Sequence, residues 1–307
     1  MKALVTGGAG FIGSHLVERL VADGHDVLVV DDLSTGRREN LAHCHVDIVK
    51  RDLVTDTVGD LVSARDVIFH LAAVPSVPRS VREPLRAHDA SATATLKLLL
   101  AARDAGVRTF VNSSSSSVYG NVARPPMQEA MATLPRSPYA VAKLAAEGYT
   151  RVFSTLFGMQ TVSLRYFNVF GPRQDPNSAY AAAIPKFIVA YEKKERPIVF
   201  DDGWQSRDFT YVANVVDANL RAANVAGLGG ESINVAAGEP RSVNELLRAI
   251  GDVFGFWLEP HYVAPRPGDI RDSHADISLA RERLGYRPIV GFDQGLRTTI
   301  EWQRGAL

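Results

Sequence analysis

Nearly continuous apolar runs alternate with amphipathic segments through the first half of the chain. The apolar runs cover 2–6, 26–30, 46–49, 66–70, 107–111 and 160–165. Such runs predict buried parallel strands, because a strand with one wet face would alternate apolar and polar residues. Segments between the runs, including a long one at 86–105, have helical spacing of apolar residues. Strands that alternate with helices predict an α/β fold with a doubly wound parallel sheet.

The pattern changes after Arg165. A turn-rich stretch at 168–177 leads into short segments, among them a helix expected near 181–194 and a strand expected near 197–200. Short elements of mixed type suit a smaller α+β lobe that covers the carboxyl edge of the sheet. We therefore expect two structural regions rather than one uniform α/β unit.

Composition limits the classes of protein to be considered. The 307 residues have a formal net charge of zero, so neither a nucleic-acid partner nor an anionic membrane surface is indicated. Cys44 is the single cysteine, which excludes an internal disulfide framework and gives no indication of a metal site. The chain enters a strand without a signal peptide, and no apolar run approaches the roughly 20 residues of a membrane span. A soluble, cytoplasmic protein is expected.

Three glycines lie where the first strand meets the first helix. Gly7, Gly10 and Gly13 directly follow the strand at 2–6 and precede a helical stripe that ends near Gly24. Glycine permits the tight turn and a close approach of the backbone to a ligand, and the helix N-terminus can receive a pyrophosphate. A glycine pattern alone is a weak signal, but one flanked by a strand and a helix is typical of dinucleotide binding.

Two acidic residues end the second strand. Asp31 and Asp32 follow the apolar run at 26–30. A carboxylate here accepts hydrogen bonds from the adenosine ribose hydroxyls and repels a 2′-phosphate, which indicates NAD rather than NADP. Arg37 and Arg38 lie nearby, and we interpret them as solvated loop charges. NAD is therefore the expected cofactor.

A tyrosine and a lysine form the candidate catalytic pair. Ser137, followed by proline, is typical of a helix start, so Tyr139 and Lys143 are expected on one face of that helix, one turn apart. An ammonium beside the phenol would lower the pKa of Tyr139 and make it a candidate general base or acid. The serine run at 113–117 follows the strand at 107–111 and would supply a hydroxyl to the same substrate oxygen.

These motifs occur together in one order, and the combination is far more specific than any single motif. The chain resembles the extended short-chain dehydrogenase/reductases, and among them the NAD-dependent UDP-sugar 4-epimerases, over essentially its whole length. The resemblance rests on Thr6-Gly7-Gly8-Ala9-Gly10-Phe11-Ile12-Gly13, Asp31, the serine run with Val118-Tyr119-Gly120, Tyr139-x-x-x-Lys143, Arg165-Tyr166-Phe167-Asn168 and Arg207-Asp208. The UDP-N-acetylglucosamine 4-epimerases are the most similar subgroup, through Ser76-Val77-Pro78-Arg79-Ser80 and the segment from Asp175 to Ala182.

The resemblance implies epimerisation at C4 of a UDP-hexose through a transient 4-keto sugar. Ser115 and Tyr139 would act on the sugar 4-OH, and Lys143 would hold the nicotinamide ribose and lower the pKa of Tyr139. The positions implied to bind NAD are Gly7, Gly10, Phe11, Ile12, Gly13, Asp31, Asp32, Leu33, Ser34, Thr35, Gly36, Asp52, Leu53, Leu71, Ala72, Ala73, Tyr139, Lys143 and Phe167. Those implied to bind the UDP-sugar are Ser76, Arg79, Ser115, Ser116, Ser117, Tyr139, Asn168, Val199, Phe200, Arg207, Arg266, Asp269 and Ser273.

The identity of the sugar depends on a few positions. Ser273 matches the family's gate residue, where a bulky side chain excludes a 2-acetamido group and a serine leaves room for it, although it can also be a mere turn residue. UDP-GlcNAc/GalNAc and UDP-glucose/galactose both remain open. UDP-glucuronate is an alternative, because Arg79 and Arg173 could meet its carboxylate. Ser91 departs from the family, which usually has a cofactor-contacting asparagine there.

Other functions are less consistent with the residues around the serine run. The family's dehydratases place Asp-Glu directly after the catalytic threonine, and its sugar-acid decarboxylases have glutamate at the position of Ser117. This chain has Ser116 and Ser117 there, so the acid needed for water elimination is missing. A catalytically silent module that binds NAD or a nucleotide sugar would be expected to lack Tyr139 or Lys143, and this chain has both.

The resemblance also implies how the chain is divided and assembled. An NAD-binding Rossmann domain is expected over 1–165, with a returning segment near 208–236, and a nucleotide-sugar-binding lobe over 166–207 and 237–307. A homodimer is expected through the helices near 86–105 and 139–157, packed as a four-helix bundle. The apolar stripes of these helices, which ordinary core packing would equally explain, contain Leu96, Leu99, Leu100, Ala145, Val152 and Phe153.

Overall fold

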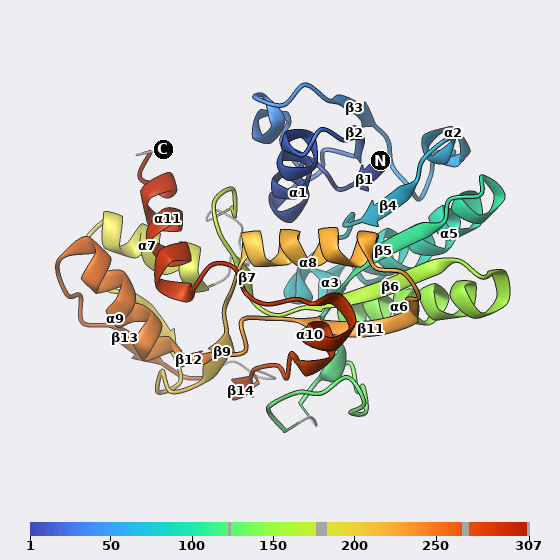
Figure 1. Ribbon diagram of the computed structural model, residues 1–307. Coiled ribbons are helices and arrows are strands. Elements are labelled where there is room, and N and C mark those ends of the chain that lie inside the picture. Colours follow the sequence, from blue (N-terminus) through green and yellow to red (C-terminus); the bar gives the residue numbers. More distant parts are fainter. Residues whose placement is uncertain (122–123, 176–182, 266–269, 306–307) are drawn as a thin grey trace.

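A seven-stranded parallel sheet organises the molecule (Figure 1). The computed structural model describes residues 1–121, 124–175, 183–265 and 270–305. The strands follow the order β11-β6-β5-β4-β1-β2-β3, and every neighbouring pair is parallel. They are β1 (Lys2–Thr6), β2 (Asp26–Asp31), β3 (Asp47–Lys50), β4 (Val67–His70), β5 (Thr109–Ser115), β6 (Gln160–Tyr166) and β11 (Gly229–Val235). The predicted doubly wound α/β sheet is confirmed.

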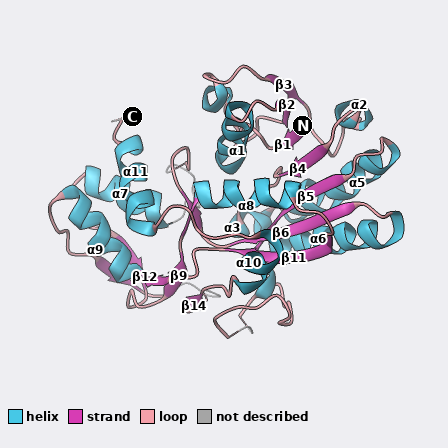
Figure 2. Ribbon diagram, viewed as in Figure 1, coloured by secondary structure: helices cyan, strands magenta, loops and turns pink. Residues whose placement is uncertain are grey.

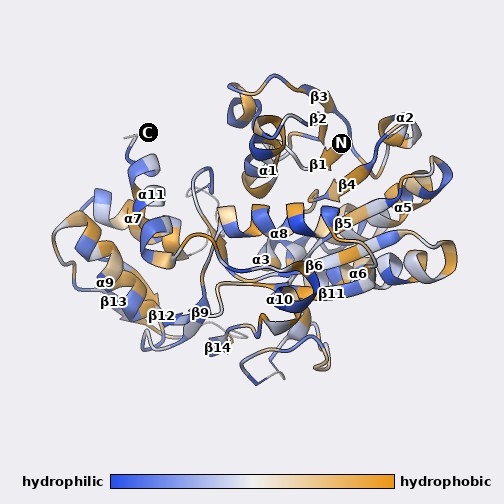
Figure 3. Cartoon of the chain, in the orientation of Figure 1, coloured by the Kyte–Doolittle hydropathy of each residue, from blue (hydrophilic) through white to orange (hydrophobic). Residues whose placement is uncertain are grey.

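Helices cover both faces of this sheet (Figure 2). On one face α1 (Phe11–Ala22) packs against α8 (Val212–Asn224). On the other face α5 (Ala94–Asp104) packs against α2 (Gly59–Val62) and α6 (Pro138–Phe157). Figure 3 shows apolar and polar residues alternating along α8, as expected for a helix that contacts a sheet with one side only.

Neighbouring residues of one strand pack in two separate hydrophobic cores. Val29 of β2 packs in a cluster with Leu16 of α1, whereas the next residue, Val30, packs in a cluster with Leu98 of α5. Because side chains alternate across a strand, one apolar run supplies both layers. This explains why the strands read as continuous apolar runs in the sequence.

The segment expected as one helix at 86–105 contains three helical parts. These are α4 (Pro84–His88), a π-helical turn η2 (Asp89–Thr93) and α5. A π-helical turn inserts one residue into the ladder and is common at functional sites. The remaining helices are α3 (Val77–Arg82), α7 (Ala183–Glu192), α9 (Val243–Phe254), α10 (Ser278–Leu284), α11 (Phe292–Gln303) and the 3₁₀ turns η1 (Arg38–Leu41) and η3 (Ser116–Tyr119). No helix among the described residues is long and apolar enough to cross a membrane.

A third core lies at one end of the molecule, where α7, α9 and α11 gather (Figure 1). Three small sheets of two or three strands accompany these helices, and the chain between β6 and β11 contributes part of this core. The short strands are β7 (Val169–Phe170), β8 (Ile198–Phe200), β9 (Ser206–Asp208), β10 (Thr210–Tyr211), β12 (Pro240–Ser242), β13 (His261–Val263) and β14 (Asp272–Ser273). Ala280 and Leu284 of α10 pack in the core of the main sheet, although this segment is expected in the nucleotide-sugar-binding lobe.

Candidate active site

The predicted cofactor residues gather along the carboxyl edge of the main sheet. They follow β1, β2, β3, β4 and β6, or lie at the start of α6. From β1 the strand order runs to β2 and β3 on one side, and through β4, β5 and β6 on the other. Ligands of open α/β sheets bind at such a switch point, outside the carboxyl ends of the strands. The topology therefore places the predicted cofactor residues where a dinucleotide would bind.

The glycine-rich turn leaves no room for side chains. Gly7 has φ +68°, and a Cβ there would lie 2.8 Å from the backbone nitrogen of Ala72. A Cβ on Gly13 would lie 2.1 Å from the carbonyl oxygen of Gly7. α1 begins after Gly10 without a side-chain cap, so its first amides remain available to an anion. This cradle fits the pyrophosphate of NAD.

Asp31 connects the glycine-rich turn to the end of β2. Its carboxylate is 6% exposed and accepts hydrogen bonds from the backbone N–H groups of Ala9 (3.0 Å) and Leu33 (2.8 Å). Burial raises the pKa of the Asp31 carboxyl, and these two hydrogen bonds oppose the rise. Asp32 is turned to the surface and accepts from the Ser34 hydroxyl at 2.7 Å. Of the two carboxylates, Asp31 is thus the one that hydrogen bonds hold beside the glycine-rich turn.

His70 belongs to a buried hydrogen-bonded chain below this turn. Its Nε2 contacts the Thr95 hydroxyl (3.0 Å) and its Nδ1 the Thr6 hydroxyl (2.7 Å). Because Thr95 donates its proton to the Ser91 carbonyl oxygen, His70 Nε2 is the donor to Thr95 and Nδ1 accepts from Thr6. Burial lowers the pKa of His70 to about 3, so the ring is neutral. The Ser91 hydroxyl is buried without a hydrogen-bond partner among the described residues.

The helix start predicted before Tyr139 is present. Ser137 caps α6 by accepting a hydrogen bond from the backbone N–H of Ala140 at 3.2 Å. Lys143 follows one turn later and is only 4% exposed. Its ammonium donates to the carbonyl oxygen (2.7 Å) and hydroxyl (3.3 Å) of Ser113. Burial lowers the pKa of Lys143 to about 8, and the nearby Glu147 carboxylate opposes this shift.

The predicted lowering of the Tyr139 pKa is wrong for the protein in this structure. Burial raises the pKa of the phenol, and hydrogen bonding with the Ser115 side chain opposes the rise. The Lys143 ammonium is directed to Ser113, so its charge does not offset the desolvation of the phenol. The contact between Tyr139 and Ser115 nevertheless joins the two groups expected to share a substrate oxygen.

Ser115 ends β5 rather than lying in a loop beyond it. The strand continues through Ser113 to Ser115, and the 3₁₀ turn η3 begins at the next residue. Ser117 donates to the Ser115 hydroxyl through both its hydroxyl (3.0 Å) and its backbone N–H (3.2 Å). Two hydroxyls are therefore held together at the carboxyl end of β5, beside the tyrosine.

The predicted substrate residues come from several separate elements of the chain. Ser76 caps α3, Asn168 follows β6, and its side-chain amide donates to the Asp208 carbonyl oxygen at 3.3 Å. Arg207 in β9 pairs in register with Ser273 in β14, which is 6% exposed. Val199 and Phe200 form β8, and the Val199 side chain is buried in the third core. Arg266 and Asp269 lie outside the described residues.

The two arginines considered for a sugar carboxylate already have partners. Arg79 forms an ion pair with Glu83 at 3.3 Å, and Arg173 forms one with Glu18 at 2.7 Å. Arg173 also donates to the Ser14 hydroxyl at 3.3 Å. Both arginines are thus engaged within the chain, which weakens the argument for UDP-glucuronate.

Sequence reasoning missed the residues that support the catalytic groups. Ser113 belongs to the serine run, but nothing in the sequence indicates that it is the partner of Lys143. Glu147 lies four residues after Lys143, a spacing that could have indicated a charge partner on the same helix face. Arg165 forms an ion pair with Glu147, but in the sequence it stands out only as part of the Arg165-Tyr166-Phe167-Asn168 motif. Neither the spacing nor the motif reveals that Arg165 and Glu147 meet.

The chain is similar to known epimerases over its full length. The family model described as "NAD dependent epimerase/dehydratase family" matches residues 3–236. The UDP-glucose 4-epimerase of Mycolicibacterium smegmatis is 43% identical over 311 residues, covering 99% of each chain. The structure of a UDP-N-acetylglucosamine 4-epimerase from Methanobrevibacter ruminantium in complex with UDP-N-acetylmuramic acid is 42% identical and has a TM-score of 0.95, covering 100% of this chain and 99% of that one.

A second solved structure shows the same similarity. The UDP-glucose 4-epimerase of Thermotoga maritima with UDP-glucose is 38% identical, has a TM-score of 0.94, and covers 100% of this chain and 99% of that one. The resemblance inferred from the motifs is therefore confirmed. With a match over most of its length and a glycine cradle that fits the dinucleotide, the chain belongs to the NAD-dependent epimerase/dehydratase family.

Proposed function

We propose that this protein is an enzyme that epimerises a UDP-hexose at C4, with NAD as a bound cofactor. The observation that carries the proposal is the meeting of Tyr139 and Ser115 at the carboxyl edge of the sheet, next to a glycine cradle for the dinucleotide. Relatives named UDP-glucose 4-epimerase and UDP-N-acetylglucosamine 4-epimerase support the same activity.

Each residue at this edge has a role that follows from its chemistry. NAD, when bound, supplies reversible hydride transfer at the sugar carbon. The turn at Gly7–Gly13 would hold its pyrophosphate and Asp31 its adenosine ribose. Tyr139 in its ionised form would take the proton of the 4-OH as general base and return it as general acid, and the Ser115 hydroxyl would orient that oxygen. Lys143, one turn further along α6 and anchored on Ser113, would hold the nicotinamide ribose.

Two UDP-hexose classes remain candidates for the substrate, and we propose the one with a 2-acetamido group. Ser273 is the residue that supports this choice, because a serine at the gate position leaves space for the acetamido group. The engagement of Arg79 with Glu83 and of Arg173 with Glu18 speaks against a sugar with a carboxylate. UDP-glucose remains the second candidate, because the gate does not exclude the smaller substrate.

Incubation with separate UDP-sugars tests the function. The purified protein is given UDP-GlcNAc, UDP-glucose or UDP-glucuronate without added reductant, and the epimers are resolved by NMR. We expect the 4-epimer from UDP-GlcNAc. The Ser273→Tyr variant is expected to lose this product while keeping any turnover of UDP-glucose. No epimer from any of the three sugars would contradict the proposed function, and product from UDP-glucuronate alone would contradict the choice of sugar.

We also propose a homodimer formed through α3, α4, α5 and α6. α3 and α4 contact α6, and together these helices carry a group of exposed apolar side chains. The most exposed are Val81 (64%), Leu85 (78%), Val141 (51%), Val152 (46%) and Leu156 (67%). Of the predicted stripes, Leu99 and Phe153 are core residues, whereas Leu100 and Val152 belong to this surface. Exposed apolar side chains gathered on helices that contact one another support a protein–protein interface.

Introducing charge on this surface is expected to separate the dimer. In Leu156→Glu a carboxylate replaces an apolar side chain that is 67% exposed in the single chain, so each protomer should stay folded. Analytical ultracentrifugation should show a dimer for the unmodified protein and a monomer for the variant. Ile289→Glu, at a 52% exposed position outside α3–α6, serves as the matched control and should remain dimeric. A dimer that survives Leu156→Glu would exclude this surface.

A further inference from the structure

A buried ion pair lies one turn beyond Lys143. The Glu147 carboxylate accepts hydrogen bonds from Arg165 Nε (2.9 Å) and Nη2 (2.7 Å). The two side chains are 2% and 3% exposed. The desolvation of two buried charges roughly cancels their attraction, and a well-packed apolar pair is often at least as stable. Stability is therefore a weak explanation for the pair, and its position relative to the catalytic groups suggests another.

The Glu147 carboxylate links the strand and the helix that carry the catalytic side chains. Its Oε1 accepts a hydrogen bond from the Ser114 hydroxyl at 2.5 Å, and Ser114 directly precedes Ser115 on β5. Its Oε2 accepts from the Ser232 hydroxyl on β11 at 2.9 Å. Glu147 itself lies two turns after Tyr139 on α6. One carboxylate thus fixes the end of β5 against the helix that presents the tyrosine.

Arg165 connects Glu147 to the turn that follows Ser115. Its Nη1 donates to the Tyr119 hydroxyl at 2.9 Å, and that hydroxyl donates to Asn234 Oδ1 at 2.7 Å. Tyr119 ends the 3₁₀ turn that starts immediately after Ser115. The strand before Ser115 and the turn after it are therefore both attached to the Glu147–Arg165 pair.

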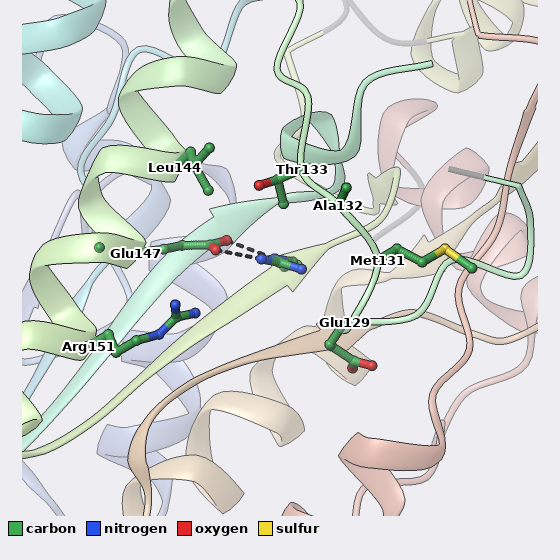
Figure 4. Close-up of a pocket in the computed structure, with 9 residues that line it drawn as sticks. Glu129, Met131, Ala132, Thr133, Leu144, Glu147 and Arg151 are labelled. Carbon is green, nitrogen blue, oxygen red and sulfur yellow. Dashed lines mark hydrogen bonds and ion pairs between the residues drawn. The ribbon is translucent and has the colours of Figure 1, made fainter. Parts of the chain in front are cut away.

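A cavity of about 410 Å³ borders the pair on the side of the 129–133 loop (Figure 4). Its charged lining residues are two carboxylates and two arginines, a balance that favours neither an anion nor a cation as ligand. Figure 4 shows the Glu147 carboxylate at the cavity wall, with Arg151 one turn further along the same helix. The lining consists of Glu129, Met131, Ala132, Thr133, Leu144, Glu147, Gly148, Arg151 and Arg165. The cavity therefore gives no indication of a ligand, and the Glu147–Arg165 pair has to be explained by its own contacts.

We propose that Glu147 is a positioning residue for proton transfer: it holds Ser115 against Tyr139 through Ser114 and Arg165. Its carboxylate also lies one turn from Lys143 on the same helix. This inference rests on the proposed epimerase function. In the described structure, the titratable groups that interact with Lys143 are Glu147, one turn further along its own helix, and His70 from β4, which is neutral. Glu147 is the negative charge that raises the pKa of this buried lysine.

Glu147→Gln separates this role from simple packing, because glutamine has nearly the same shape. We expect kcat to fall about tenfold, since small displacements of reacting groups are costly, with little change in KM for the UDP-sugar. Without the carboxylate the pKa of Lys143 falls below its present value of about 8. Lys143 then loses its charge at lower pH, so the alkaline limb of the kcat profile should move about one unit to lower pH.

A second variant removes the link without leaving a buried charge unpaired. Ser114→Ala is expected to lower kcat with the alkaline limb unmoved, because Glu147 keeps its charge. Arg151→Gln, exposed on the same helix, is the matched control and should match the parent protein in both respects. If Glu147→Gln leaves kcat unchanged, or lowers it without moving the alkaline limb, the inference is overturned.

A readout independent of turnover keeps this test distinct from that of the proposed function. Hydrogen exchange of the backbone amides at 113–117 should be faster in Glu147→Gln than in the parent protein and unchanged in Arg151→Gln. If the parent protein epimerises no UDP-sugar, the proposed function fails, and the exchange rates alone decide whether Glu147 fixes the serine run. Unchanged exchange in Glu147→Gln would overturn the positioning role.

Discussion

Replacing Tyr139 with phenylalanine is expected to lower kcat for epimerisation by about 10²- to 10⁴-fold, the usual contribution of a positioned acid–base group. The variant loses only the hydroxyl that contacts Ser115, and the ring and its packing on α6 remain. KM for the UDP-sugar and the affinity for NAD should change little. Initial rates, substrate titrations and NAD binding measured on the same preparation check this expectation.

The control for this variant lies on the same helix. Tyr149 is 36% exposed, so Tyr149→Phe removes a hydroxyl from α6 without touching the serine run. Its turnover should equal that of the parent protein. Near-normal turnover in Tyr139→Phe would show that the phenol does not transfer the proton, and the Ser115 hydroxyl would then become the first group to test.

Gly13→Ala is expected to abolish NAD binding, or to weaken it at least tenfold, and to destabilise the fold. The added Cβ would lie 2.1 Å from the Gly7 carbonyl oxygen and 2.8 Å from the Gly8 Cα, both backbone atoms that cannot move without opening the turn. Overpacking of this kind costs about 1–3 kcal/mol of unfolding free energy. Fluorescence titration with NAD and thermal unfolding measure the two effects.

Gly148→Ala is the matched control for this substitution. Gly148 also lies in a helix, but a Cβ there meets no atom within 4 Å. Alanine is favoured over glycine inside helices by about 0.5–1 kcal/mol, so this variant should bind NAD normally and unfold at the same or a higher temperature. If Gly13→Ala behaved like Gly148→Ala, the close approach at the glycine-rich turn would not be required.

The main sheet and the catalytic helix could be predicted because they depend on local signals. The apolar runs are the strands whose side chains pack in the cores on both faces of the sheet. Ser137 and the proline after it marked the start of α6 within one residue. The serine run was harder to interpret. Polar hydroxyls suggest a loop, but Ser113 and Ser114 continue β5 because their hydroxyls find buried partners on α6.

Features that depend on contacts between distant residues could not be predicted. The rise in the Tyr139 pKa follows from how deeply the phenol is buried and from the direction of the Lys143 ammonium toward Ser113. The network around Glu147 joins residues from β5, β6, α6 and β11, and no sequence spacing encodes that meeting. The π-helical turn at Asp89–Thr93 interrupts a segment whose leucine spacing alone indicates one continuous helix.

The position of β11 has a consequence for how the protein is made. A nascent chain that has just completed β6 exposes the unpaired edge of that strand, because β11 is synthesised only after β7–β10, α7 and α8. Until then Glu147 also lacks its partner Ser232. An open strand edge can pair with other chains, so we expect the ribosome-bound intermediate to be more prone to aggregation than the finished sheet.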